Sequence, residues 1–191
     1  MKLKIVLLFL ISLNLFSCEE SHIPKKRAYY RLETPTLEYK NIEAPQFYLD
    51  ILKSSQFGMR KDNVDWSTIE YPTLNAALYL SYFKDTNIEK LTEDARKSAY
   101  KHTIKADDII NMQFALPEKN LYGTVYSIEG NAATPAIFFF TDSVQQFLHG
   151  TVYFNCSPNA DSLKPVIQFI RQDIEHIIET FEWKDSEQKS N

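Results

Sequence analysis

The last part of the chain contains the feature that most limits how it can fold, a long apolar stripe at helical spacing. Eight apolar side chains recur every three or four residues: Leu163, Val166, Ile167, Ile170, Ile174, Ile177, Ile178 and Phe181. Arg171, Asp173 and Glu175 are predicted to lie away from this stripe. A helix of this kind must bury its apolar side, and the strands before it supply the nearest apolar surface. The sequence therefore predicts a closing helix packed on a sheet.

The start of this helix is indicated by residues that cap helices. Asn159, Asp161 and Ser162 all offer side-chain oxygens to the free amides of a first turn. Pro165 follows them and is predicted to lie in that first turn, where a missing amide removes no hydrogen bond.

Apolar runs earlier in the chain predict strands. The runs cover residues 28–33, 46–52, 64–71, 76–83, 110–116, 121–128, 136–141 and 146–155. The run 136–141 is continuously apolar, which is typical of a strand buried on both faces. Trp66 is expected to anchor the core, and residues 53–63, which are polar, are expected to form a mobile loop.

A first helix is predicted between the early and the late strands. It starts after the capping residues Asp85-Thr86-Asn87 and ends near Lys105. The order of strands, helix, strands and helix indicates an α+β fold. We expect a mostly antiparallel sheet of about six to eight strands packed with two main helices, an order that resembles the PsbP/Mog1-like α/β/α sandwich.

The N-terminus resembles the signal of a bacterial lipoprotein. Lys2 and Lys4 precede an apolar run at 5–16, which is too short for the ~20 residues that a membrane span needs. Leu15-Phe16-Ser17-Cys18 then resembles a lipobox, in which the cysteine is acylated and becomes the first residue of the mature protein. The alternative is an ordinary cleaved signal followed by a chance cysteine. We therefore predict lipid attachment at Cys18, on a membrane that the sequence does not identify as inner or outer.

These features divide the chain into four predicted parts. Residues 1–17 form the cleaved signal, 18–27 a lipid-anchored tether, 28–183 a single α+β domain and 184–191 a frayed tail. The domain is expected outside the cytoplasm.

Composition excludes several classes of function. Removal of the signal leaves 19 basic and 25 acidic side chains, a formal net charge of −6 that argues against nucleic acid as a partner. Only four glycines occur, and none form a phosphate-binding loop, so no nucleotide cofactor is expected. Cys156 is the one thiol besides Cys18, and we expect it to be a small buried residue.

The sequence contains little evidence for catalytic or metal-binding groups. The residue types of a catalytic triad occur in Thr141-Asp142-Ser143 together with His149, but a nucleophile elbow is lacking. An ordinary turn is therefore the favoured interpretation of 141–143. His102 with Asp107 and Asp108 could hold a metal, but a structural histidine is favoured. The four histidines, His22, His102, His149 and His176, do not have metal-site spacing. No catalytic, cofactor or metal residue is predicted.

Several collinear segments resemble the gliding motility lipoprotein GldD family of the Bacteroidetes. They are Tyr29-Tyr30-Arg31-Leu32, 75–82, 99–107, Gly130-Asn131-Ala132, Thr141-Asp142-Ser143, 147–150, 153–155, 161–163 and 178–181. The resemblance implies a lipoprotein required for gliding and for the associated type 9 secretion system. Cys18 is the one residue of this chain for which the resemblance implies a functional role. An arginine is common in the family where this chain has His149.

Together these observations predict a non-enzymatic envelope lipoprotein that assembles, holds or stabilises other motility and secretion proteins. Gly130, Asn131, Asp142 and Ser143 are the candidate interaction residues. Two alternatives stay open. One is a ligand-binding or hydrolytic domain that acts on envelope glycan through an aromatic-lined cleft. The other is a chaperone-like lipoprotein that protects one partner from degradation.

Overall fold

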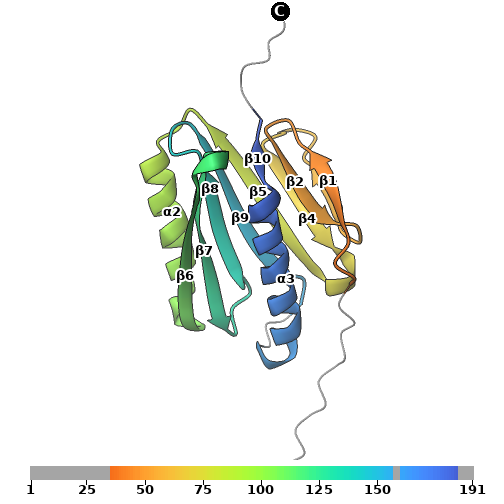
Figure 1. The fold of residues 1–191 in the computed structure, drawn as a ribbon. Helices are drawn as coiled ribbons and strands as arrows, with labels where there is room; N and C mark the ends of the chain where they lie inside the picture. The colour runs from red at the N-terminus through yellow and green to blue at the C-terminus, as the bar shows by residue number, and fades with distance from the viewer. Residues whose placement is uncertain (1–34, 157–159, 185–191) are drawn as a thin grey trace, which may run out of the picture. The chain divides into compact units, whose positions relative to one another are not determined.

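A seven-stranded antiparallel sheet forms the centre of the fold (Figure 1). The structure is a computed structural model that describes residues 35–156 and 160–184, with side chains for 35–156 and 162–184. The strands lie in the order β3-β4-β5-β9-β8-β7-β6. Their bounds are β3 Gln56–Met59, β4 Trp66–Tyr71, β5 Ala76–Lys84, β6 Ala106–Leu116, β7 Leu121–Gly130, β8 Ala136–Thr141 and β9 Gln146–Phe154.

The described residues all belong to one compact unit of the chain, 31–191. The predicted signal, Cys18, the tether and the strand expected at 28–33 lie outside the described residues, as does the tail after residue 184.

Strand β8 is buried on both faces, as its continuous apolar run predicts. Phe138 and Phe140 belong to the core on one face of the sheet, and Ile137 and Phe139 belong to the core on the other. Alternate side chains of a strand point to opposite faces, so a strand covered on both sides needs apolar residues at every position.

Helix α3, Ala160–Thr180, packs on one face of the large sheet beside a second, three-stranded sheet (Figure 1). That small sheet has the order β1-β2-β10, with β1 Tyr39–Glu43, β2 Phe47–Leu52 and β10 Glu182–Trp183. The apolar stripe of α3 is buried against it and against the inner side of β5 and β9. Burial of the stripe of α3 on a sheet is confirmed.

Helix α2, Ile88–Tyr100, covers the opposite face, and a 3-10 turn, Lys101–Ile104, continues it. The side chain of Asn87 accepts a hydrogen bond from the backbone amide of Lys90 at 2.9 Å and caps the helix as predicted. Ala95 and Ala99 are small enough to bring the helix close to Phe139 and Phe147. The predicted α+β fold with a mostly antiparallel sheet and two main helices is confirmed.

The prediction of a loop at 53–63 is wrong. Residues 56–59 form β3, which pairs with β4 from Gln56 opposite Glu70 to Met59 opposite Ser67. Phe57 packs against the core, while Gln56, Gly58 and Met59 are exposed, because an edge strand needs few side chains with core partners. The short strands β1 and β10 were also not predicted.

Trp66 does not anchor the core. Strand alternation turns Ser67, Ile69 and Tyr71 inward, so Trp66 lies on the other side and is 44% exposed. The guanidinium carbon of Arg60 lies 4.8 Å from the centre of its ring.

Three further predictions are wrong near α3. The helix begins at Ala160, so Pro165 lies in its second turn and removes one internal hydrogen bond. Cys156 is exposed because β9 ends at Phe154 and the chain leaves the sheet there. Asp173 is fully buried, because it lies between the stripe and Tyr71 of β4.

Candidate functional site

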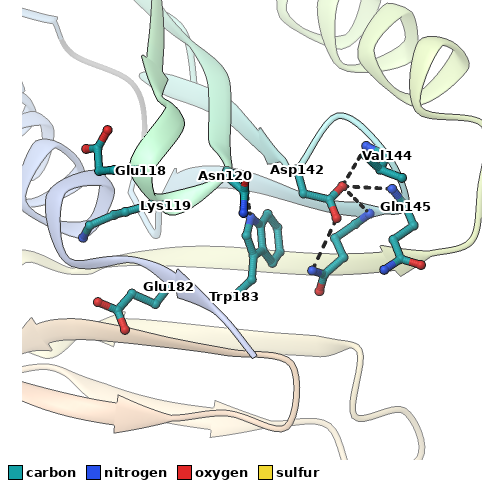
Figure 2. Close-up of a pocket in the computed structure, with 9 residues that line it drawn as sticks. Glu118, Lys119, Asn120, Asp142, Val144, Gln145, Glu182 and Trp183 are labelled. Atoms are coloured by element: carbon teal, nitrogen blue, oxygen red, sulfur yellow. Dashed lines mark hydrogen bonds between the residues drawn. The ribbon is translucent and has the colours of Figure 1, made fainter. Parts of the chain in front are cut away.

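A polar groove opens where three separate segments meet at one end of the large sheet. Figure 2 shows its lining residues, Glu118, Lys119, Asn120, Asp142, Val144, Gln145, Gln146, Glu182 and Trp183. These come from the 3-10 turn after β6, from the β8–β9 turn and from β10. The groove has a volume of about 500 Å³. We call it the Trp183 groove.

Trp183 is positioned from both sides. Its indole Nε1 donates a hydrogen bond to the backbone carbonyl of Asn120 at 3.2 Å, and Figure 2 shows the ring between Asn120 and Asp142. The ring packs edge-on against Phe181, with centroids 4.6 Å apart. Asn120 itself adopts a left-handed backbone, φ 48°, which asparagine tolerates better than most residues. A partly exposed aromatic side chain is therefore held in a fixed orientation at the groove.

Asp142 organises the β8–β9 turn. Its Oδ1 accepts hydrogen bonds from the backbone amides of Val144, Gln145 and Gln146, each at 2.9 Å. Burial opposes ionisation of Asp142, but the three amide hydrogen bonds outweigh it and hold the pKa of its carboxyl below the usual value. The neighbouring Ser143 has a left-handed backbone, φ 66°, and its amide donates to Thr141 Oγ1. Asp142 thus has a structural task in addition to lining the groove.

Negatively charged side chains lie around the groove. The Tyr82 hydroxyl donates to Gln146 Oε1 at 3.0 Å beneath the groove. Burial raises the pKa of Tyr82 to about 12, and the nearby carboxylates of Asp142, Asp65 and Asp85 add to the effect.

A second depression, of about 490 Å³, adjoins the groove and shares Lys119 and Glu182 with it. Five carboxylates line the two depressions: Asp50, Glu118, Asp142, Glu179 and Glu182. Lys119 is the one cation among their described lining residues, and its Nζ donates to the carbonyl of Glu179 at the end of α3. That contact satisfies a terminal helix carbonyl, so the lysine is already engaged and the region keeps its negative charge.

The four predicted interaction residues fall at two different places. Asp142 and Ser143 lie in the turn after β8, whereas Gly130 and Asn131 lie at the opposite end, before β8 begins. Gly130 has φ +95°, and a Cβ there would lie 2.8 Å from the amide nitrogen of Asp107, so glycine is required for this close approach. The structure brings Asp142 to the groove and does not bring Gly130 there.

A triad of Asp142, Ser143 and His149 is not assembled. His149 lies within β9, opposite Ser81 of β5 and Phe139 of β8, and lines a separate depression under α2 with Asp94 and Ser98. Burial lowers the pKa of His149. Asp142 turns its carboxylate to its own turn, so the two side chains do not converge.

The other histidines also lie apart. His176 of α3 stacks on Tyr39 with centroids 3.6 Å apart, while His102 follows α2, where burial lowers its pKa. His22 is outside the described residues. In the described part of the chain, no three His, Cys, Asp or Glu side chains gather in a way that could hold a metal ion.

One buried polar pair remains. The Tyr71 hydroxyl donates to Asp173 Oδ2 at 2.5 Å, and both residues are inaccessible to solvent. Burial raises the pKa of Asp173 to about 6. The pair lies inside the core between α3 and β4, so the protonation of Asp173 bears on the stability of the fold.

Sequence reasoning missed Trp183, Glu182 and Lys119 as site residues. The signal was weak: Phe181-Glu182-Trp183 alternates apolar and polar residues directly after the helix, as a short strand does. Only pairing with β2 identifies that segment as β10, with Trp183 opposite Phe47.

Comparison with known proteins gives one family. Over residues 19–183 the chain matches the family model described as gliding motility lipoprotein GldD. A search of curated proteins finds no significant match. In the described residues, none of the helices is both long and apolar enough to cross a bilayer. Since the family match covers most of the sequence, the chain belongs to the gliding motility lipoprotein GldD family.

Proposed function

We propose that this protein is a lipid-anchored envelope factor that supports gliding and the associated type 9 secretion system by holding or stabilising a partner protein, without catalysis. The family match supports the link to motility and the lipoprotein assignment. The observation that carries the binding role is the Trp183 groove, in which an oriented indole ring lies with the exposed carboxylates of Glu118 and Glu182.

The chemistry of the groove suits a basic segment of another protein. Glu118 and Glu182 line the groove and are exposed, so an incoming lysine or arginine can approach them before any desolvation is required. An arginine can also stack on the face of Trp183, an interaction worth roughly 0.5–2 kcal/mol depending on exposure. Aromatic anchors ringed by charge are common at protein interfaces.

The anchor supports the same role. Acylation at Cys18 and the short tether that follows would hold the domain close to a membrane. A partner embedded in or attached to that membrane would then meet the groove at a raised effective concentration.

The test is a crosslinked pull-down from intact envelopes. Wild type is compared with Cys18→Ala, with the groove variant Glu118→Lys/Glu182→Lys, and with the control Glu70→Lys/Glu175→Lys, which makes the same charge change at exposed sites elsewhere. We expect motility or secretion proteins to co-purify with wild type and the control and to be lost from the other two. Equal recovery with the groove variant would reject the groove as the docking site.

Deletion tests the wider role. Loss of gliding and of secretion is expected, and a host that keeps both would disprove the proposed function. If one envelope protein disappears from cells whenever this protein is deleted, the partner-stabilising form of the proposal is favoured over scaffolding.

The glycan alternative has one observation in its favour. The Trp183 ring lies beside the amides of Asn120, Gln145 and Gln146, and sugar sites use aromatic faces together with amide groups. Titration of the purified protein with soluble peptidoglycan fragments, followed by tryptophan fluorescence, distinguishes this role from protein binding.

A further inference from the structure

Strand β6 is a long sheet edge with an unused side. It has 11 residues, Ala106–Leu116, and is the last strand of the seven-stranded sheet. Among the described residues it pairs with β7 alone. The backbone amides and carbonyls along its outer side are therefore available to another strand.

The other sheet edges are better protected. The opposite edge, β3, is only four residues long. In the small sheet, β1 is five residues long and includes Lys40. Short length and lysine are common protections against edge pairing, and β6 has neither, since 106–116 contains no Lys, Arg or Pro.

Apolar side chains are exposed along β6. Ile110 is 52% exposed and Met112 is 45% exposed. Both point to the same face of the sheet as Phe114, because they lie at alternate positions opposite Ser127, Val125 and Gly123 of β7. The edge thus offers unpaired backbone groups together with an apolar row.

We propose that β6 pairs in antiparallel orientation with β6 of a second copy of this chain, about a two-fold axis at Asn111. Asn111 is the midpoint of the strand, so this register gives the longest overlap of the two copies. The regular part of β6, residues 108–116, follows the irregularity that its ladder with β7 shows between Ala106 and Asp108. It also places Ile110 of one copy opposite Met112 of the other and covers both exposed side chains.

The charges of the strand fit this orientation. Asp107 and Asp108 lie at one end only, so an antiparallel pair separates the acids of the two copies, whereas a parallel pair would oppose them. Lys105 and Glu118 flank the strand at opposite ends and come near each other across the axis.

Neighbouring registers are worse. An axis at Met112 would set Lys105 opposite Lys119 of the other copy, and an axis at Ile110 would set Met112 opposite Asp108. The self-complementary charge pattern therefore identifies a second copy as the occupant of the edge. This inference does not depend on the Trp183 groove or on what binds there.

Site-specific crosslinking in intact envelopes tests the register. In a Cys156→Ser background, Asn111→Cys places two thiols opposite each other at the axis, where cross-strand Cβ atoms lie about 4.5–5.5 Å apart. The matched control is Ala115→Cys, also exposed on β6. Its two thiols would be offset by eight residues, roughly 27 Å. Oxidation with copper phenanthroline should give a covalent dimer only for Asn111→Cys.

Absence of that dimer, or equal dimer from both variants, would overturn the proposal.

A measurement in solution supplements the crosslinking: the detergent-extracted protein should have the mass of a dimer by light scattering. Ile110→Lys should raise the dissociation constant by at least about tenfold, since a two-fold interface loses the contact twice. Because Ile110 is half exposed, the variant should keep its fold, which circular dichroism checks. A wild-type monomer at high concentration would also overturn the proposal.

Discussion

The buried carboxyl of Asp173 should make the stability of this protein depend on pH in an unusual direction. Asp173 is fully buried under α3, and the Tyr71 hydroxyl donates to one of its oxygens at 2.5 Å. The other oxygen, Oδ1, has no hydrogen-bond partner among the described residues. Burial therefore disfavours the charged form, and the pKa of Asp173 rises to about 6 although Tyr71 and His176 act in the opposite sense.

The sign and the size follow from linkage. The folded protein holds the proton of Asp173 more tightly than the unfolded chain, in which the pKa is about 3.9. Its contribution to stability is thus complete below about pH 4 and is lost as the pH rises through about 6. A difference of about two pKa units corresponds to about 3 kcal/mol of folding free energy, as an order of magnitude.

The variant Asp173→Asn cannot ionise at this position. Its free energy of unfolding should lack the loss between pH 4 and pH 7.5 that Asp173 causes in the wild type. The free energy of unfolding of the variant minus that of the wild type should therefore increase by about 3 kcal/mol as the pH rises over that range. The buried amide of the asparagine adds a cost that does not depend on pH, so only the change with pH is compared.

The assay is urea unfolding followed by tryptophan fluorescence at several pH values from 4 to 7.5, with Trp66 and Trp183 as probes. Glu175→Gln, an exposed position on the same helix, controls for loss of a carboxylate. A variant minus wild-type difference that stays constant with pH would refute the reasoning, because Asp173 would then have the same pKa in both states.

Three further substitutions, two of them with a control, test local features. A Cβ at Gly150 would lie 2.1 Å from the ring of Phe138, so Gly150→Ala should cost about 1–3 kcal/mol or more in urea unfolding. At Gly58 an added Cβ would have no neighbouring atom within 4 Å, so Gly58→Ala should be nearly neutral in the same urea unfolding experiment. Asn87→Ala removes the cap of α2 and should lower the free energy of unfolding by about 1 kcal/mol. Asn87→Asp should keep most of this capping stabilisation, and thermal unfolding of both variants measures the difference. Asp142→Ala leaves three turn amides without their acceptor and should lower stability by about 2 kcal/mol, with amide hydrogen exchange accelerated in that turn.

The candidate site could be predicted only in part. Asp142 and Ser143 were expected at an interaction surface because they form a polar turn, and Asp142 does line the groove. Trp183 could not be assigned from its neighbours, because its hydrogen-bond partner Asn120 is 63 residues away in the sequence. The proposed antiparallel pairing of β6 likewise depends on a sheet order that no local pattern gives.

The sequence by itself determined the type of most elements, because periodicity is a local property. The run 136–141 needs apolar cover on both faces, and the stripe from Leu163 to Phe181 needs a surface to bury it, whatever those surfaces are. Asn87 is a cap for the same local reason.

Only the tertiary structure decided which elements meet. Asp173 looks like a solvated residue in its helix, yet it is buried because Tyr71, 102 residues earlier, lies beneath it. Trp66 looks like a core residue, yet the pairing of β4 with β5 turns it outward. The physical reason is common to both: burial depends on what packs against a side chain, and long-range packing is set by sheet order and strand register rather than by neighbours in the chain.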